Sequence, residues 1–198
     1  MILLSELQYH PPIAWFQQVL KADEVLLEAH ENYIKQSYRN RCHVLTSQGV
    51  KALTVPVKGG NRKTIITSLE IDYEQNWVNQ HWRTIRSAYG NSPFFLFYAD
   101  HFQAIYDKQP RLLFELNREF LHLYFKFLRI TKPLGLTERY EEKYAPAVND
   151  LRNCIHPKKA PDNLATKPYN QVFGKTFAPG LSILDLLFNQ GPEAPHYL

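Results

Sequence analysis

The sequence predicts an α/β fold, in which a mixed sheet begins with a parallel βαβ unit and the second half of the chain is helical. Two apolar runs near the N-terminus, residues 1–4 and 25–27, have the length of buried strands, and an amphipathic segment separates them. Strand, helix and strand within about thirty residues make a βαβ unit, whose two strands are parallel. A long helical pattern after residue 110 supplies the helical second half.

Length and composition predict one domain over residues 1–198. A chain of 198 residues that is 44% hydrophobic is long enough to bury a sizeable core. A net charge of +4 without a basic stripe is not typical of a nucleic-acid-binding protein. No apolar run reaches the length of a membrane span, and the N-terminus lacks the features of a signal peptide. Together with two cysteines that lack metal-binding spacing, these features indicate a cytoplasmic protein.

The first half of the chain contains signals for one helix and one hairpin. The Pro11-Pro12 pair precedes apolar residues at helical spacing and marks the start of the first helix. Residues 52–57 and 65–71 alternate apolar and polar positions, which predicts two strands joined by a turn at residues 58–61. The glycines of that turn, with their flanking basic residues, also suggest an anion nest, but a plain hairpin is the preferred interpretation.

Helical patterns dominate the second half. Asp72 and Gln75 have capping-box spacing before a helix that Gly90 ends, and two further helices are expected over residues 97–106 and 111–130. Residues 131–177 are rich in proline and charge and are predicted to be irregular, as binding loops often are. The tail is expected to form one more helix that docks on the body, with a capping box at Ser182.

The polar run from Glu28 to Arg41 is the first candidate site, because no apolar period explains it. His30 and Glu31 are candidate catalytic residues, since a histidine titrates near neutrality and an adjacent carboxylate raises its basicity. The other polar side chains of the run are candidate ligand-binding groups that clamp an anion, hydrogen-bond or stack: Asn32, Lys35, Tyr38, Arg39, Asn40 and Arg41. The alternative is a salt-bridged surface loop.

A second candidate lies at Tyr9-His10, between the first strand and the first helix. A helix N-terminus attracts phosphate or carboxylate, so His10 is a candidate catalytic residue and Tyr9 a candidate ligand contact. The alternative is a histidine in a well-capped loop. His81 is predicted to lie either on the far wall of the site, as a ligand contact, or on the surface, and the sequence favours neither position. No two histidines have the spacing of a zinc site, so neither a metal nor a cofactor is expected.

Several motifs together resemble the WbqC-like family of bacterial proteins. They are Gln8-Tyr9-His10-Pro11-Pro12, Trp15-Phe16, Asp23 to Glu28, Lys35 through Asn40-Arg41, Leu53 to Lys58, Trp77, His81-Trp82-Arg83 and Tyr89 to Phe95. The tail resembles the version in the Bacteroidetes branch. The chain departs from the family pattern at Tyr9, where proline is frequent, at Ala14, where glycine is frequent, and at Ala29-His30, where two aspartates are frequent.

The resemblance implies a link to O-antigen or other surface-polysaccharide biosynthesis, and no established reaction. The leading hypothesis is a cytoplasmic transferase acting on a nucleotide-activated sugar or a similar anionic small molecule. Its site would lie at the carboxyl ends of the first two strands, where open α/β sheets bind ligands. The alternative is a non-catalytic ligand-binding or scaffold protein, which would spread the same residues over a flat face.

Overall fold

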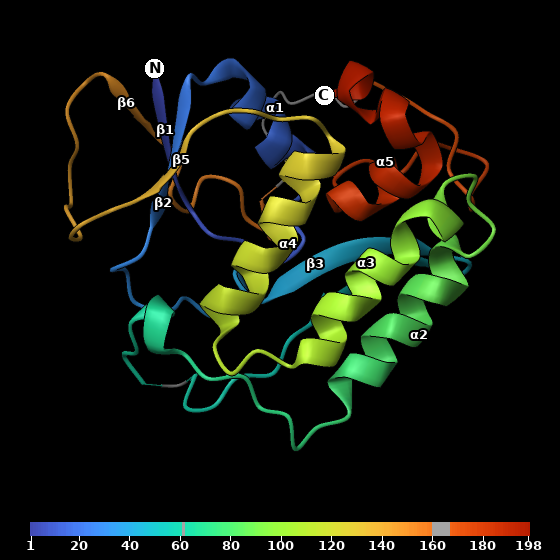
Figure 1. Ribbon diagram of the computed structural model, residues 1–198, viewed down its shortest axis with the longest axis horizontal. Helices are drawn as coiled ribbons and strands as arrows, with labels where there is room; N and C mark the ends of the chain where they lie inside the picture. Colours follow the sequence, from blue (N-terminus) through green and yellow to red (C-terminus); the bar gives the residue numbers. More distant parts are fainter. Residues whose placement is uncertain (61, 160–166) are drawn as a thin grey trace.

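A computed structural model of the chain describes residues 1–60, 62–159 and 167–198. Its main sheet has four parallel strands in the order β5-β2-β1-β6 (Figure 1). Strand β1 (Ile2–Glu6) pairs with β2 (Glu24–Glu28) along its whole length, and helix α1 (Ile13–Lys21) connects them. The predicted α/β class and its initial parallel strand pair are therefore confirmed.

Most apolar residues of β1 and β2 are buried, as expected for central parallel strands, and Ile2 and Leu26 are half-buried. The outer strands, β5 (Leu134–Leu136) and β6 (Val148–Asp150), come from the segment that was predicted to be irregular. That prediction is wrong for these two stretches, because strands of three residues are too short to show an alternating pattern. Residues 160–166 of the same segment lie outside the described residues.

A separate antiparallel pair, β3 (Arg41–Thr46) and β4 (Gly49–Thr54), forms a hairpin. The hairpin predicted over residues 52–57 and 65–71 is wrong. The second of these stretches contains a 3-10 turn, η1 (Ile66–Ser68), and meets the first at an isolated bridge between Val57 and Ile71. Pro56 has no N–H to donate to a ladder, and Ile66, Leu69 and Ile71 are buried in the core, whereas Ile65 is exposed. Of the predicted turn, position 61 lies outside the described residues.

The remaining helices form the second half of the fold, as predicted: α2 (Trp77–Tyr89), α3 (Phe95–Lys108), α4 (Leu113–Phe127), α5 (Ile183–Gln190) and the final 3-10 segment η2 (Gly191–Tyr197). In Figure 1 the main sheet lies on one side of α4, and α3 and α2 lie on the other. Helix α5 contacts α1, α2 and α3, so it joins the two ends of the chain. No helix in the described part of the chain is long and apolar enough to cross a membrane.

The two predicted capping boxes have different outcomes. Ser182 is the N-cap of α5, and its Oγ accepts a hydrogen bond from the N–H of Leu184 at 3.2 Å. Asp72 is not the N-cap of α2, which begins five residues later, at Trp77, with Asn76 as its N-cap. Its carboxylate instead accepts hydrogen bonds from the backbone of Glu74 and the side chain of Gln75, because aspartate readily closes such local turns.

Candidate functional site

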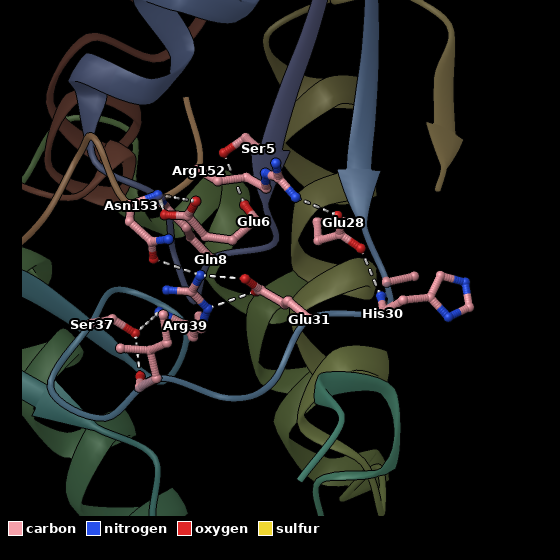
Figure 2. Close-up of polar contacts among 12 residues, drawn as sticks. Ser5, Glu6, Gln8, Glu28, His30, Glu31, Ser37, Arg39, Arg152 and Asn153 are labelled. Carbon is pink, nitrogen blue, oxygen red and sulfur yellow. Dashed lines mark hydrogen bonds and ion pairs between the residues drawn. The ribbon is translucent and has the colours of Figure 1, made fainter. Parts of the chain in front are cut away.

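The carboxyl ends of β1 and β2 each carry a buried glutamate, and the strand register places Glu6 opposite Glu28. Glu28 accepts hydrogen bonds from Thr137 Oγ1 and from the backbone N–H of His30, both at 2.8 Å. Its other oxygen lies 3.0 Å from Nη1 of Arg152. Glu6 accepts from the side chain of Gln8 and from the backbone N–H at position 153. The two strand ends therefore present a polar cluster that long-range contacts complete (Figure 2).

Arg39 and Glu31 form a buried ion pair beside these glutamates. Arg39 is 0% exposed and Glu31 is 5% exposed. The guanidinium binds both carboxylate oxygens, through Nε at 2.7 Å and Nη2 at 2.5 Å (Figure 2). Arg39 is therefore buried and does not form an exposed anion clamp together with Arg41. The carboxylate of Glu31 pairs with the guanidinium of Arg39 rather than with the ring of His30. Buried charges need a partner of opposite sign, and each of these residues provides it for the other.

Burial raises the pKa of Glu31, Arg39 offsets part of that rise, and the nearby carboxylates of Glu6 and Glu28 add to it.

Arg152 is the second guanidinium of the cluster. It binds Asp150 through Nε at 3.0 Å and Nη2 at 2.6 Å. The cluster thus contains four carboxylates and two guanidinium groups at the edge of the main sheet.

Two clefts open beside this cluster. The strand-end cleft has a volume of about 390 Å³ and is lined by His30, Glu31, Asn32, Tyr33, Ile34, Tyr140, Arg152 and Asn153. The basic cleft has a volume of about 330 Å³ and is lined by Tyr33, Lys35, Gln36, Asn40, Arg41, Val57, Gly59 and Gly60. Tyr33 is common to both. A Cβ at Gly60 would lie 3.0 Å from Val57 and 3.4 Å from the Tyr33 ring, so glycine there leaves room for this shared wall.

The structure brings together six of the predicted site residues at these clefts. His30, Glu31 and Asn32 line the strand-end cleft, while Lys35, Asn40 and Arg41 line the basic cleft. His30 is exposed, and its Nε2 lies 3.0 Å from the carbonyl oxygen of Thr137. A carbonyl oxygen only accepts hydrogen bonds, so Nε2 carries the proton and Nδ1 is the basic nitrogen of the neutral ring.

Tyr9, His10 and His81 lie elsewhere, in the core between α2, α3 and α4. The hydroxyl of Tyr9 bonds to Nδ1 of His81 at 2.8 Å and to the hydroxyl of Tyr106 at 2.5 Å. His10 bonds to the hydroxyls of Tyr106 and Tyr124. Burial lowers the pKa of His10 well below its ordinary value, and burial lowers that of His81 to about 4. These side chains are neutral core groups that are buried and hydrogen-bond to other side chains of the core.

His81 also lines a third cavity of about 200 Å³ between β4 and α2.

Tyr38 is buried as well, with its ring 5.6 Å from that of His43 and its pKa raised by burial to about 12. Among the residues that the structure describes, no group of three or more His, Cys, Asp or Glu side chains is arranged to hold a metal ion.

Comparison with known proteins agrees with the motifs in the first half of the chain and extends beyond them. A family model described as the WbqC-like protein family matches residues 8–156 and 162–197. The chain belongs to the WbqC-like protein family. The uncharacterized protein Rv1507c of Mycobacterium tuberculosis is 31% identical to it over 227 aligned residues, covering 100% of this chain and 96% of the mycobacterial protein. No solved structure matches the chain.

Sequence reasoning missed several residues of the site in this WbqC-like chain: Tyr33, Thr137, Tyr140, Arg152 and Asn153. Four of them line the strand-end cleft, and Thr137 bonds to Glu28 behind it. A usable signal existed for Glu6 and Glu28, because each is a charged residue that directly ends an apolar strand. Arg152 and Asn153 gave no such signal, since they lie in a segment without periodicity.

Proposed function

We propose that this WbqC-like protein is a cytoplasmic transferase that binds a nucleotide-activated sugar, or a similar anionic small molecule, in surface-polysaccharide biosynthesis of the O-antigen type. The observation that carries this proposal is the pair of clefts joined at Tyr33. One cleft is basic, and the other is lined by carboxylate, amide and guanidinium groups. An elongated ligand with a phosphate-bearing half and a hydroxyl-bearing half matches that division. The biosynthetic role follows the family resemblance.

Each half of such a ligand has chemically suitable neighbours. Lys35 and Arg41 attract the phosphates, with Arg41 offering the planar donor geometry that phosphate oxygens accept. Nδ1 of His30 accepts the proton of an incoming hydroxyl or amine as that group attacks the activated sugar. Arg39 has a supporting role, because it is buried against Glu31.

The test is isothermal titration calorimetry with UDP-glucose, dTDP-glucose and GDP-mannose on the wild type and on Arg41→Ala. We expect at least one of the three to bind the wild type and Arg41→Ala to weaken that binding at least tenfold. Arg83→Ala is the charge-matched control, because Arg83 is exposed on α2 and lines neither cleft. Absence of binding by all three compounds, or equal weakening by both variants, contradicts the proposal.

A second candidate, a non-catalytic binding protein, is favoured by one observation. Glu6, Glu28, Glu31 and Asp150 are already hydrogen-bonded or ion-paired within the protein, as expected of a structural cluster. The two candidates differ in turnover. A transferase releases the nucleoside diphosphate when an acceptor is supplied, and His30→Gln abolishes that release while keeping the affinity. A binding protein retains the nucleotide sugar intact with every acceptor.

A further inference from the structure

Asn153 has an unusual backbone conformation that the strand-end glutamate supports. Its φ angle is +61°, in the left-handed region that few residues other than glycine adopt, although asparagine tolerates it. Its backbone N–H donates to Oε2 of the buried Glu6 at 3.0 Å. A carboxylate at the end of β1 therefore holds the backbone of a residue 147 positions further along the chain.

The side chain of Asn153 is oriented by Arg39. Nη2 of Arg39 lies 2.9 Å from Oδ1 of Asn153. A guanidinium has donors only, so the amide oxygen faces Arg39, and the Nδ2 donors remain available to a different acceptor. Figure 2 shows this arrangement, with Oδ1 toward Arg39 and the amide nitrogen on the other branch. Asn153 is exposed and lines the strand-end cleft beside Glu31 and Arg152.

We propose that Asn153 determines the specificity of the strand-end cleft by donating hydrogen bonds from Nδ2 to a hydroxyl of the glycosyl group. This inference rests on the proposed function. Glu31, in the same cleft, supplies the complementary acceptor, because each carboxylate oxygen keeps a lone pair after bonding to Arg39. A donor and an acceptor side by side match the hydroxyls of a sugar, each of which accepts and donates.

The same geometry gives roles to the buried charges behind the cleft. Glu6 holds the backbone of Asn153, and Arg39 holds its amide group. Both are positioning residues that act through Asn153. The arrangement orients the ligand: the sugar lies in the strand-end cleft, and the phosphates lie in the basic cleft across Tyr33.

The experiment compares Asn153→Asp and Asn153→Gly with the wild type. Aspartate keeps the shape and the left-handed tolerance of asparagine and still accepts from Arg39, but it lacks the Nδ2 donors. Glycine adopts the same φ angle without strain and removes the amide entirely. Calorimetry measures binding of UDP-glucose, dTDP-glucose and GDP-mannose and of UDP, dTDP and GDP. For each pair that binds, we expect both variants to lose at least tenfold in affinity for the nucleotide sugar and less than twofold for the nucleoside diphosphate.

Three results overturn the inference. The first is unchanged affinity for the nucleotide sugar in Asn153→Gly. The melting temperature of this variant is measured as a control, to show that it is folded. The second is an equal loss for the nucleotide sugar and its nucleoside diphosphate, which would show a structural role. The third concerns a wild type that binds none of the three nucleotide sugars. The proposed function then fails, and titration of all three proteins with glucose 1-phosphate decides the inference about Asn153. The inference stands if only the wild type binds glucose 1-phosphate. It falls if the variants bind this compound equally well, or if none of the proteins binds it.

Discussion

Replacing Arg39 with alanine tests the reasoning about the buried cluster most directly. Arg39 is 0% exposed, and its guanidinium makes two hydrogen bonds to Glu31, at 2.7 and 2.5 Å, and one to Asn153 at 2.9 Å. The substitution leaves the carboxylate of Glu31, itself 5% exposed, without its charged partner. Breaking a buried pair from one side costs about 3–5 kcal/mol, so we expect the free energy of unfolding at pH 7 to fall by that amount.

The loss should depend on pH in a definite direction. Burial already raises the pKa of Glu31 above its ordinary value of 4.5, and removing Arg39 raises it further. A carboxyl whose folded pKa is raised destabilises the fold when ionised, and this penalty disappears as pH falls from the folded pKa toward the unfolded one. The difference between Arg39→Ala and the wild type should therefore be smaller at pH 5 than at pH 8.

The assay is urea denaturation followed by tryptophan fluorescence at both pH values. Arg41→Ala is the matched control, because Arg41 is half-buried, makes one side-chain hydrogen bond to Thr54, and should cost no more than about 1 kcal/mol. An Arg39→Ala protein as stable as Arg41→Ala, or one whose loss is the same at pH 5 and pH 8, would refute the account of the ion pair.

Three further predictions concern the rest of the fold. Deleting everything after Gly180 should lower the melting temperature steeply, because α5 is buried and each large apolar side chain is worth about 1.5–3 kcal/mol; an unchanged melting temperature would show that the tail does not support the core. Burial lowers the pKa of His81 to about 4, so this residue contributes stability above pH 6.5 that is lost as pH falls toward 4, at up to about 1.4 kcal/mol per pH unit. His81→Gln should reduce the acid slope of the unfolding free energy by about one proton, and an unaltered slope would exclude that role. Thr137→Val removes the donor to Glu28 and should cost about 1–3 kcal/mol in urea denaturation, while the exposed Thr131→Val should have little effect; equal stability of both variants would contradict the importance of that contact.

Local patterns predicted much of the framework. The apolar runs of β1 and β2, the proline start of α1 and the Ser182 cap of α5 are each encoded within a few neighbouring residues, and all appear in the structure. The β3–β4 hairpin was missed because the alternation over residues 65–71 was stronger than that over residues 41–46, although it reflects core packing rather than a ladder.

The sequence by itself determined the fold class, the parallel pair at its centre and the polar run from Glu28 to Arg41 that leaves β2. Only the tertiary structure decided which of those polar groups are buried and which line a cleft. Arg39 bonds to Asn153 across 114 positions, and Arg152 bonds to Glu28 across 124. A charged side chain is buried or exposed according to whether an opposite charge reaches it in the folded chain, and no local pattern records a partner that distant.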